Sequence, residues 1–368
     1  MPQMLAFVSL VVIIHAGMQS YVAWWAIRNF PGLRIGLGAL SLFILLGAAG
    51  LPFSLYCLRA FRGAWTERLA YAGFLWLGSV FIALTATVLG DLAVLSAPAA
   101  RPWAKTSVLG VTAAACLWAV CNASRPPVIS DIDVPIPGLS ADLDGFTVVQ
   151  LSDLHLGVTV SLEKFSQIVA QVDALKPDLI VMTGDIFDAG LRDDGAVERI
   201  GAGLKAGHGV LAVMGNHEFY HGVEVSSRTF AGMGARLLRN EVATLPGGLQ
   251  VAGVDDVRTA GLSAEDVAAV LAKLDPARPS LFLCHQPLGF DVAARAGVGL
   301  MLSGHTHAGQ IFPFGLIVRL FYPRFNGLYR EGRSSLYVTS GAGQWGPPMR
   351  LFTRAEIVRF TLRAALQK

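Results

Sequence analysis

The residues of this chain with the clearest chemical potential are Asp, His and Asn side chains that follow apolar, strand-like runs of sequence. In an open α/β sheet the carboxyl ends of the strands converge on one crevice, so side chains placed there can act together. Carboxylates and neutral imidazoles are suitable ligands for Mn, Fe, Zn or Mg. Five of the eight histidines occupy such positions, which scattered core histidines would not do. The groups are Asp153-Leu154-His155, Gly184-Asp185-Ile186-Phe187-Asp188, Gly215-Asn216-His217-Glu218, His285 and Gly304-His305-Thr306-His307.

A donor set of this kind can hold two metal ions about 3.5–4 Å apart. One carboxylate must bridge the ions so that two cations can approach each other, and Asp185 is the best candidate. Such ions polarise phosphoryl oxygens and lower the pKa of a water between them, and the resulting hydroxide attacks phosphorus in line with the leaving oxygen. His217 follows a ligand without being one, so it could protonate that leaving oxygen. Gly184, Gly215 and Gly304 allow tight backbone turns beside these groups.

The elements that must position these groups are short strands alternating with helices, after residue 144. This alternation predicts a layered α/β domain. Helices are expected over 162–174 and 264–274, with Ser161 and Ser263 as N-caps, and over 195–205. Strands are expected over 146–152, 179–183, 210–214, 249–254, 280–284, 300–303, 336–340 and 357–360.

The first third of the chain has a different composition and predicts a membrane region. Of the 368 residues 53% are hydrophobic and only 15% are charged, against about 25% charged in soluble proteins. Four apolar stretches, over 4–27, 35–58, 70–95 and 108–123, are candidates for membrane spans; the fourth is short. We therefore expect a four-helix transmembrane bundle over 1–123, a Pro-rich linker over 124–144 and the α/β domain over 145–368. The protein is then a multi-pass protein of the cell membrane, with the lipid bilayer as a partner.

Charge and cysteine content bear on the partners of the protein, the state of its cysteines and its orientation in the membrane. Residues 1–123 hold seven Lys or Arg against two acidic residues, while the whole chain has a net charge of +3, so the rest is slightly acidic and no nucleic-acid partner is expected. No pair of the four cysteines has the spacing of a metal finger, so reduced, buried cysteines are expected. The soluble domain is expected on the cytoplasmic side, although the positive-inside rule gives no preference. The two sides count Arg59, Arg62, Arg68 and Arg125 against Arg28, Arg34, Arg101 and Lys105.

The series DLH, GDIFD, GNHE, H and GHTH resembles the calcineurin-like metallophosphoesterase superfamily over about residues 145–368. The stretches SGHTHAGQI and LYVTSGAGQWGPPMRLF are similar to its bacterial membrane-associated branch. The resemblance implies a pair of sheets flanked by helices, a four-layer α-β-β-α sandwich, with two divalent metal ions: Mn²⁺ first, with Zn²⁺, Fe²⁺ or Fe³⁺ and Mg²⁺ as alternatives. By the same resemblance Asp153, His155, Asp185 and His307 would hold one ion, Asp185, Asn216, His285 and His305 the other, and His217 would be the acid, with Asn216 and His217 contacting the substrate.

The resemblance also bears on the phosphoester substrate. Related proteins of this branch act on phosphodiesters or lipid-linked nucleotide diphosphates, so a phosphodiester or diphosphate bond in a lipid-linked or nucleotide-linked substrate is expected. Protein phosphatases of the superfamily carry Arg where this chain has Ala189 and Met214, which argues against a protein substrate. The branch commonly has Gly at the position of Ala308, and we expect this change to be tolerated. Two alternatives stay open: a tethered phosphodiesterase for soluble substrates, and a non-enzymatic ligand-binding regulator or transporter.

Several further residues admit two interpretations. Asp188 either orients a ligand or is a turn acid, and Glu218 either supports a ligand or begins a helix. Asp255 and Asp256 are expected to form a turn. The apolar run 311–322 is either a buried core strand or a lip that touches the bilayer. His208 and His221 are not expected to be ligands, although His221 could line the pocket.

Overall fold

The computed structural model describes residues 2–32, 36–61, 63–188 and 190–364, and the chain divides into two units that are considered separately. The first unit is Met1–Ser124 together with two short segments, Ile311–Pro313 and Gly346–Leu351. The second unit holds the rest of the chain and begins at Arg125. Of the residues used above, Arg34, Ile35, Arg62 and Ala189 lie outside the described residues.

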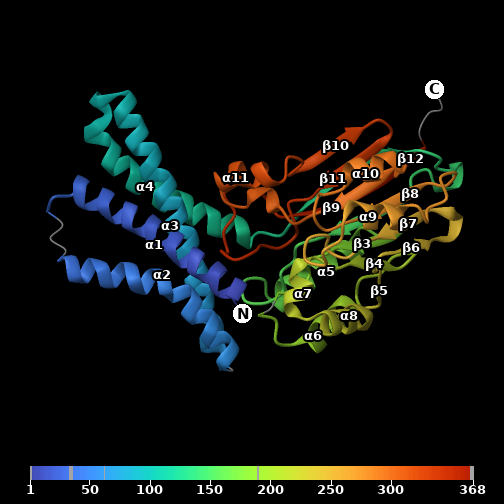
Figure 1. The fold of residues 1–368 in the computed structure, drawn as a ribbon, viewed down its shortest axis with the longest axis horizontal. Helices are drawn as coiled ribbons and strands as arrows, with labels where there is room; N and C mark the ends of the chain where they lie inside the picture. The colour runs from blue at the N-terminus through green and yellow to red at the C-terminus, as the bar shows by residue number, and fades with distance from the viewer. Residues whose placement is uncertain (1, 33–35, 62, 189, 365–368) are drawn as a thin grey trace. The chain divides into compact units, whose positions relative to one another are not determined.

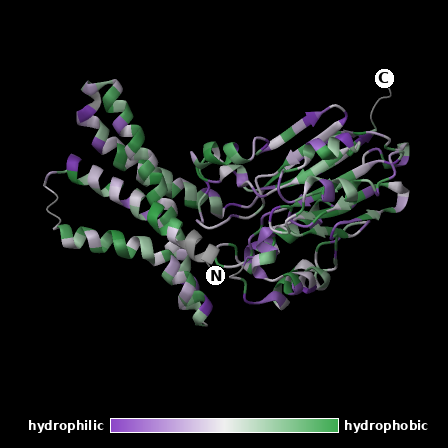
Figure 2. Cartoon of the chain, viewed as in Figure 1, coloured by the Kyte–Doolittle hydropathy of each residue, from purple (hydrophilic) through white to green (hydrophobic). Residues whose placement is uncertain are grey.

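The first unit contains four long helices, each apolar and long enough to cross a membrane. They confirm the four apolar stretches, and the fourth helix begins at Arg101 rather than at 108, which gives it the length of a full span. Few purple, hydrophilic residues lie along these helices in Figure 2. The four are α1 (Pro2–Asn29), α2 (Leu37–Ala60), α3 (Ala64–Ser96) and α4 (Arg101–Ser124).

Two segments from late in the sequence pack within this helical unit. Ile311, Met349 and Leu351 form an apolar cluster with Ile82 of α3 and Ala119 of α4. The backbone N–H of residue 350 donates to the Ala119 carbonyl at 3.0 Å. These two segments therefore belong with the apolar helices, although the expected domain division assigned them to the soluble part.

The second unit is built on two six-stranded sheets (Figure 1). The strand order is β1-β12-β2-β3-β4-β5 in one sheet and β10-β11-β9-β8-β7-β6 in the other. Most neighbours are parallel; the antiparallel pairs are β12 with β2, β10 with β11 and β6 with β7. The strands are β1 (Val128–Ile136), β2 (Thr147–Leu151), β3 (Leu179–Thr183), β4 (Val210–Val213), β5 (Ala235–Leu237), β6 (Glu241–Thr244), β7 (Gln250–Gly253), β8 (Ser280–Leu283), β9 (Leu300–Ser303), β10 (Gly327–Glu331), β11 (Ser334–Val338) and β12 (Glu356–Ala364).

All eight expected strands are present, six of them with ends shifted by one to four residues, but β1, β5, β6 and β10 were not expected. The segment 124–144, expected to be a Pro-rich linker, contains β1, which pairs in parallel with β12 along nine residues. Pro135 fits there because β1 is an edge strand with a single neighbour. The linker prediction is therefore wrong for residues 128–136.

Three apolar clusters show that the second unit has four layers. The inner faces of the two sheets pack on each other, and Val148 of β2 points into this cluster. Its neighbour Val149 points the other way, against α5 (Leu162–Ala174), α6 (Asp194–Gly201) and α8 (Val223–Gly232). The outer face of the second sheet packs against α9 (Ala264–Leu271) and α10 (Phe290–Arg295). Burial on both faces explains the continuous apolar runs of the strands, and the arrangement confirms the α-β-β-α sandwich.

Helices α5, α6 and α9 begin where a polar side chain caps them. Ser161 accepts a hydrogen bond from the Lys164 backbone N–H, and Ser263 forms a capping box with Asp266, as expected. The third expected helix, 195–205, is shorter and runs from Asp194 to Gly201. It starts one residue earlier than expected because the Asp193 side chain caps it. The run 311–322 is not a core strand, because it contains an exposed helix, α11. The helices are α5 (Leu162–Ala174), α6 (Asp194–Gly201), α7 (Asn216–His221), α8 (Val223–Gly232), α9 (Ala264–Leu271), α10 (Phe290–Arg295) and α11 (Phe314–Phe321).

Candidate metal centre

The predicted ligand residues follow strands of both sheets and come together at one edge of the sandwich. Strands β2, β3 and β4 are neighbours in the first sheet, and β8 and β9 are neighbours in the second. Each of the five is followed within a few residues by a predicted ligand. The seven are Asp153 and His155 after β2, Asp185 after β3, Asn216 after β4, His285 after β8, and His305 and His307 after β9.

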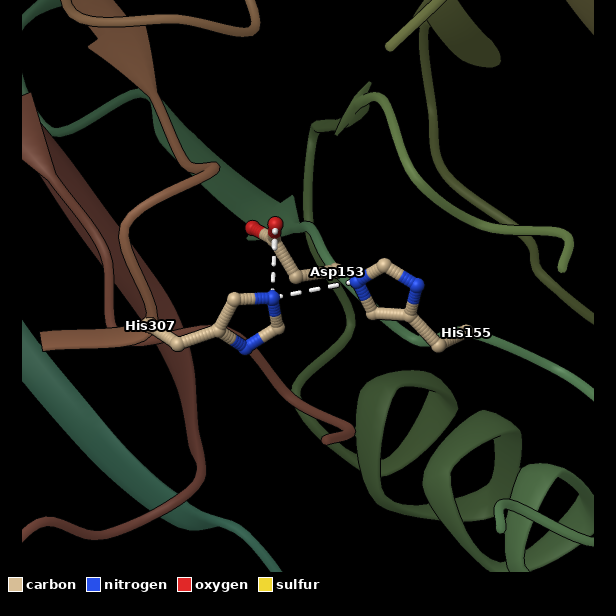
Figure 3. A group of neighbouring side chains, drawn as sticks. All are labelled: Asp153, His155 and His307. Carbon is tan, nitrogen blue, oxygen red and sulfur yellow. Dashed lines mark hydrogen bonds and ion pairs between the residues drawn. The ribbon is translucent and has the colours of Figure 1, made fainter. Parts of the chain in front are cut away.

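One group of donors joins the turn after β2 with the turn after β9 (Figure 3). The Nε2 atoms of His155 and His307 lie 3.0 Å apart, and His307 Nε2 is 3.4 Å from Asp153 Oδ1. All three residues are buried. Two imidazole nitrogens facing each other beside a carboxylate are the arrangement that a shared cation would stabilise.

A second group lies on the other side of Asp185. Asp185 Oδ2 is 3.1 Å from His285 Nε2, which in turn is 3.2 Å from His305 Nδ1. The same Oδ2 atom lies 3.7 Å from His155 Nε2, in the first group. Asp185 therefore faces both groups, as a bridging carboxylate must.

The backbone at these residues is strained. Asp153, His155, Asp185, His305 and His307 have φ of 54°, 51°, 54°, 71° and 49°, the left-handed region that side chains other than Gly rarely adopt. Strain of this kind persists where the surrounding structure over-determines it, and it clusters at functional sites. Five strained residues in three turns at one edge of the sandwich thus support the prediction that this edge carries the chemistry.

Two glycines let the ligand turns approach each other. A Cβ on Gly304 would lie 2.1 Å from Asp153 Oδ2, and a Cβ on Gly215 would lie 2.2 Å from Asp185 Oδ1. Neither carboxylate could keep its place beside a larger residue. The backbone N–H of His305 also donates to Asp153 Oδ1 at 2.9 Å, and that of His217 donates to Asp185 Oδ1 at 2.9 Å.

The polar atoms of the site fit divalent cations. Asn216 Oδ1 is buried and has no hydrogen-bond partner among the described residues, which leaves a carbonyl oxygen available as a ligand. Burial raises the pKa of the Asp153 carboxyl to about 6, with the Asp185 carboxylate adding to the effect and His285 opposing it. Bound cations would neutralise these buried carboxylates and favour their ionised form.

Glu218 holds the ligand turns in place through hydrogen bonds to their backbone. It is fully buried, and its two oxygens accept four backbone N–H groups: Oε2 from Asp185 and Gly215, Oε1 from Ile186 and Phe187. The carboxylate thereby ties the turn after β3 to the start of α7. Of the two interpretations of Glu218, support of a ligand is the one that this geometry favours.

His217 lies beside the ligands at the start of α7. Its Nδ1 is 3.4 Å from Asp188 Oδ1, and its ring packs edge-on to His155 with 4.5 Å between centroids. Burial disfavours the charged imidazolium, yet the carboxylates of Asp185 and Asp188 raise the pKa of His217 to about 9. Trp345, half exposed, packs edge-on against the same ring.

A chain of hydrogen bonds that the sequence did not indicate leads away from His305. Asp256 accepts from Gln286 Nε2 at 2.8 Å, Gln286 Oε1 accepts from the Tyr322 hydroxyl at 2.9 Å, and the Tyr322 oxygen lies 2.9 Å from His305 Nε2. A carboxylate only accepts and a hydroxyl has one hydrogen, so each direction is determined and His305 Nε2 must donate. Its Nδ1 lone pair then faces Asp185 and His285, the tautomer that a metal ligand needs.

The remaining candidate residues lie outside this cluster. Asp255 pairs with Arg239, with 2.8 Å between carboxylate and guanidinium atoms. His221 Nε2 is 2.9 Å from Asp194 Oδ1, while His208 packs against Phe146. Asp256 forms the expected turn by accepting from the Thr259 N–H at 2.8 Å, in addition to its bond with Gln286. The four cysteines are free, as expected, although Cys116 is half-buried and Cys121 exposed rather than buried.

Fold and donor geometry together define a class: α-β-β-α sandwich proteins with buried donors for a two-metal centre at one edge of the sheets. The family model described as calcineurin-like phosphoesterase matches residues 146–309. The metallophosphoesterase YkuE of Bacillus subtilis is 34% identical over 232 residues, which cover 60% of this chain and 80% of that protein. The chain belongs to the calcineurin-like phosphoesterase family, and the resemblance seen in its motifs is confirmed.

Two longer relatives extend the comparison. A Danio rerio protein named transmembrane protein with metallophosphoesterase domain is 36% identical over 270 residues, covering 69% of this chain and 62% of that protein. A metallophosphoesterase of Campylobacter jejuni is 35% identical over 247 residues, covering 66% of this chain and 65% of that protein. The chain thus spans somewhat less than two thirds of the length of these two relatives.

Proposed function

We propose that this protein is a membrane-anchored phosphoesterase that uses two divalent metal ions to hydrolyse a phosphodiester or diphosphate bond. The observation that carries the proposal is the position of Asp185, whose Oδ2 faces His285 at 3.1 Å and His155 at 3.7 Å. A carboxylate between two donor groups offsets the repulsion between two cations and lets them sit side by side. The four apolar helices support the membrane anchor.

The two ions would share Asp185 and differ in their other donors. Asp153, His155, Asp185 and His307 would hold one, and Asp185, Asn216, His285 and His305 the other. When bound, two such ions polarise the phosphoryl oxygens and supply a hydroxide nucleophile at neutral pH. Mn²⁺ is the first choice for this oxygen- and nitrogen-rich set, with Zn²⁺, iron or Mg²⁺ as alternatives.

His217 is the residue that would hand a proton to the leaving oxygen. One of its ring nitrogens lies within 4.8 Å of donor atoms of both His155 and Asp185, so it borders the site from the side of α7. Asp188 Oδ1 lies 3.4 Å from its Nδ1 and so orients the ring. Asn216 and His217 together would contact the phosphoryl group.

The substrate would be a lipid-linked or nucleotide-linked ester at the membrane surface. Met214, where protein phosphatases of the family carry Arg, is buried and offers no charge to clamp a phosphoprotein. A membrane anchor brings the site close to lipid-linked esters, which supports this substrate class. The same anchor is also compatible with a soluble nucleotide-linked ester, so an experiment must distinguish the two substrate classes.

The test uses the full chain, purified in detergent, with bis-p-nitrophenyl phosphate and added Mn²⁺. Hydrolysis that requires Mn²⁺ and two bound metal ions per chain are the expected results. Asn216→Ala should lose both most of the activity and one bound ion, whereas Asn326→Ala, at an exposed turn, should behave like the parent protein. Metal binding without any turnover would favour the ligand-binding alternative. Comparing a phosphodiester held in lipid vesicles with the soluble ester then decides between the two substrate classes.

A further inference from the structure

The helix α11 carries its apolar side chains on its outer face. Leu316, Ile317, Leu320 and Phe321 are 59%, 48%, 79% and 61% exposed. Their spacing of i, i+1, i+4 and i+5 puts them on one side of the helix. An eight-residue helix with this arrangement is the reverse of a surface helix in a soluble domain, whose apolar face packs inward.

The inner face of α11 packs on the loop that holds two candidate ligands. Gly315 lies so close to Gly309, two residues after His307, that a Cβ on Gly309 would be 2.3 Å from the Gly315 Cα. One helical turn after Val318, Tyr322 brings its hydroxyl to 2.9 Å from His305 Nε2. The loop 305–309 is therefore contacted by Gly315 near the start of α11 and by Tyr322 directly after its end.

The sandwich itself offers no cover for the outer face. None of the four exposed side chains belongs to the apolar clusters formed among the described residues, and α11 lies beyond the ends of the strands rather than on a face of either sheet (Figure 1). Contiguous exposed apolar surface of this kind marks a contact with a partner or a membrane.

The neighbouring sequence indicates what contacts the outer face of α11. Ile311–Pro313, the residues directly before α11, group with the apolar helices of the first unit, and Ile311 packs there with Ile82 and Ala119. Only three residues separate the end of α4 from β1, a span of at most about 11 Å. A domain joined by so few residues can reach the surface of the membrane that the four helices cross.

The charge of the segment agrees with a lipid surface. Arg319 is the only charged residue between Phe312 and Pro323. Its guanidinium stacks over the Phe325 ring at 4.4 Å, beside the apolar face. A helix that lies in the membrane interface has this pattern: exposed Leu, Ile and Phe side chains, with a basic residue beside them.

We propose that α11 is an interfacial helix, whose outer face sits among the headgroups and upper acyl chains of a phospholipid bilayer while its inner face holds the loop 305–309. This location does not depend on the proposed function. Its consequence does: the candidate metal centre would open at the bilayer surface, where a lipid-linked ester is presented directly.

Fluorescence from a single labelled position tests the location. In the full chain with Cys57, Cys116 and Cys121 replaced by Ser, Leu320→Cys is labelled with an environment-sensitive dye; Cys284 remains, because burial raises the pKa of its thiol and keeps it unreactive. The matched control is Glu265→Cys on the exposed side of α9. In nanodiscs of zwitterionic and anionic phospholipid, the dye at 320 should emit at shorter wavelength and be quenched by spin-labelled acyl chains, while the dye at 265 should be quenched by aqueous iodide.

Two results would overturn the proposal. One is a dye at 320 that behaves like the dye at 265. The other is protection at 320 that disappears when each nanodisc holds one chain, because a second copy would then be the occupant of the face.

The consequence for the site has its own test, on variants in which both Leu320 and Phe321 are replaced by Ser, with Leu328→Ser on β10 as the control. Turnover of a vesicle-borne phosphodiester should fall at least about tenfold in the double variant, with turnover of the soluble ester unchanged. An equal loss on both esters would contradict membrane docking as the cause. Absence of turnover in every variant and in the parent would instead contradict the proposed function, and the fluorescence result would stand.

Discussion

Replacing Tyr322 with Phe removes one oxygen atom and breaks the hydrogen-bond chain that orients His305. The ring can stay in place over His305, where the two centroids are 5.1 Å apart. Two polar atoms lose their partner: the Nε2 of the half-buried His305 and the Oε1 of the buried Gln286, each 2.9 Å from the Tyr322 oxygen. Because His305 is then free to carry its proton on Nδ1, the nitrogen that faces Asp185 and His285 is no longer reserved for a metal ion.

The size of the effect follows from these two lost bonds. Mutating a residue that orients a metal ligand typically lowers metal affinity about 10- to 100-fold. We expect this loss at one of the two metal sites, because Tyr322 bonds to His305, which belongs to only one of the two donor sets. Isothermal titration of the metal-free protein with Mn²⁺ should show one unchanged and one weakened binding event. Activity on the soluble ester should recover when Mn²⁺ is raised in proportion.

Tyr337→Phe is the matched control for this experiment. The Tyr337 hydroxyl is also buried and donates to Glu356 at 3.1 Å, but it contacts none of the candidate ligands. It should lower the unfolding temperature without changing either Mn²⁺ affinity. If Tyr322→Phe leaves both affinities as they are, or weakens both equally, then the hydrogen-bond chain does not set the tautomer of His305 and the reasoning is refuted.

Three further predictions concern the backbone of the site. Glu218→Gln leaves part of the four buried N–H groups without an acceptor, at about 1–3 kcal/mol each, so the unfolding temperature and Mn²⁺ affinity should both fall; an unchanged melting curve would contradict the role given to this carboxylate. Gly304→Ala places a methyl group 2.1 Å from Asp153 Oδ2, so metal analysis should find fewer than two Mn²⁺ per chain, and a full complement would show that the turn can relax. Ala308, with φ of 51°, is strained in a way that Gly is not, so Ala308→Gly should raise the free energy of unfolding by about 0.5–1 kcal/mol, and a lower unfolding temperature would mean that its methyl group makes compensating contacts.

Much of the fold could be predicted because the decisive signals are local. Strands buried on both faces appear as short apolar runs, and β3 and β9 were located to the residue. Ser161 and Ser263 mark helix starts because a hydroxyl at that position satisfies a backbone N–H. The order of the ligand motifs indicated the metal centre for a related reason, since parallel strands deliver their carboxyl ends to one edge.

What escaped prediction depends on partners far away in sequence. β1 looks like a linker because it contains Pro135 and two acidic residues, and only its pairing with β12 makes it a strand. Tyr322 carries no motif, and its role follows from contacts with His305 and Gln286. The run 311–322 is apolar without an unambiguous period, so the sequence could not show that its apolar side would face outward.

The position of β12 within its sheet sets the order in which the second unit can form. β12 (Glu356–Ala364) lies between β1, the first strand after the helices, and β2. The strand that lies between β1 and β2 is therefore synthesised about 200 residues after β2. The sheet cannot close until residue 364 has left the ribosome. A nascent chain waiting beside the membrane exposes two unpaired strand edges throughout that interval. Folding of the whole second unit therefore depends on residues 356–364. A truncation that removes them leaves every candidate ligand in the chain, but β1 then has no neighbouring strand with which to pair.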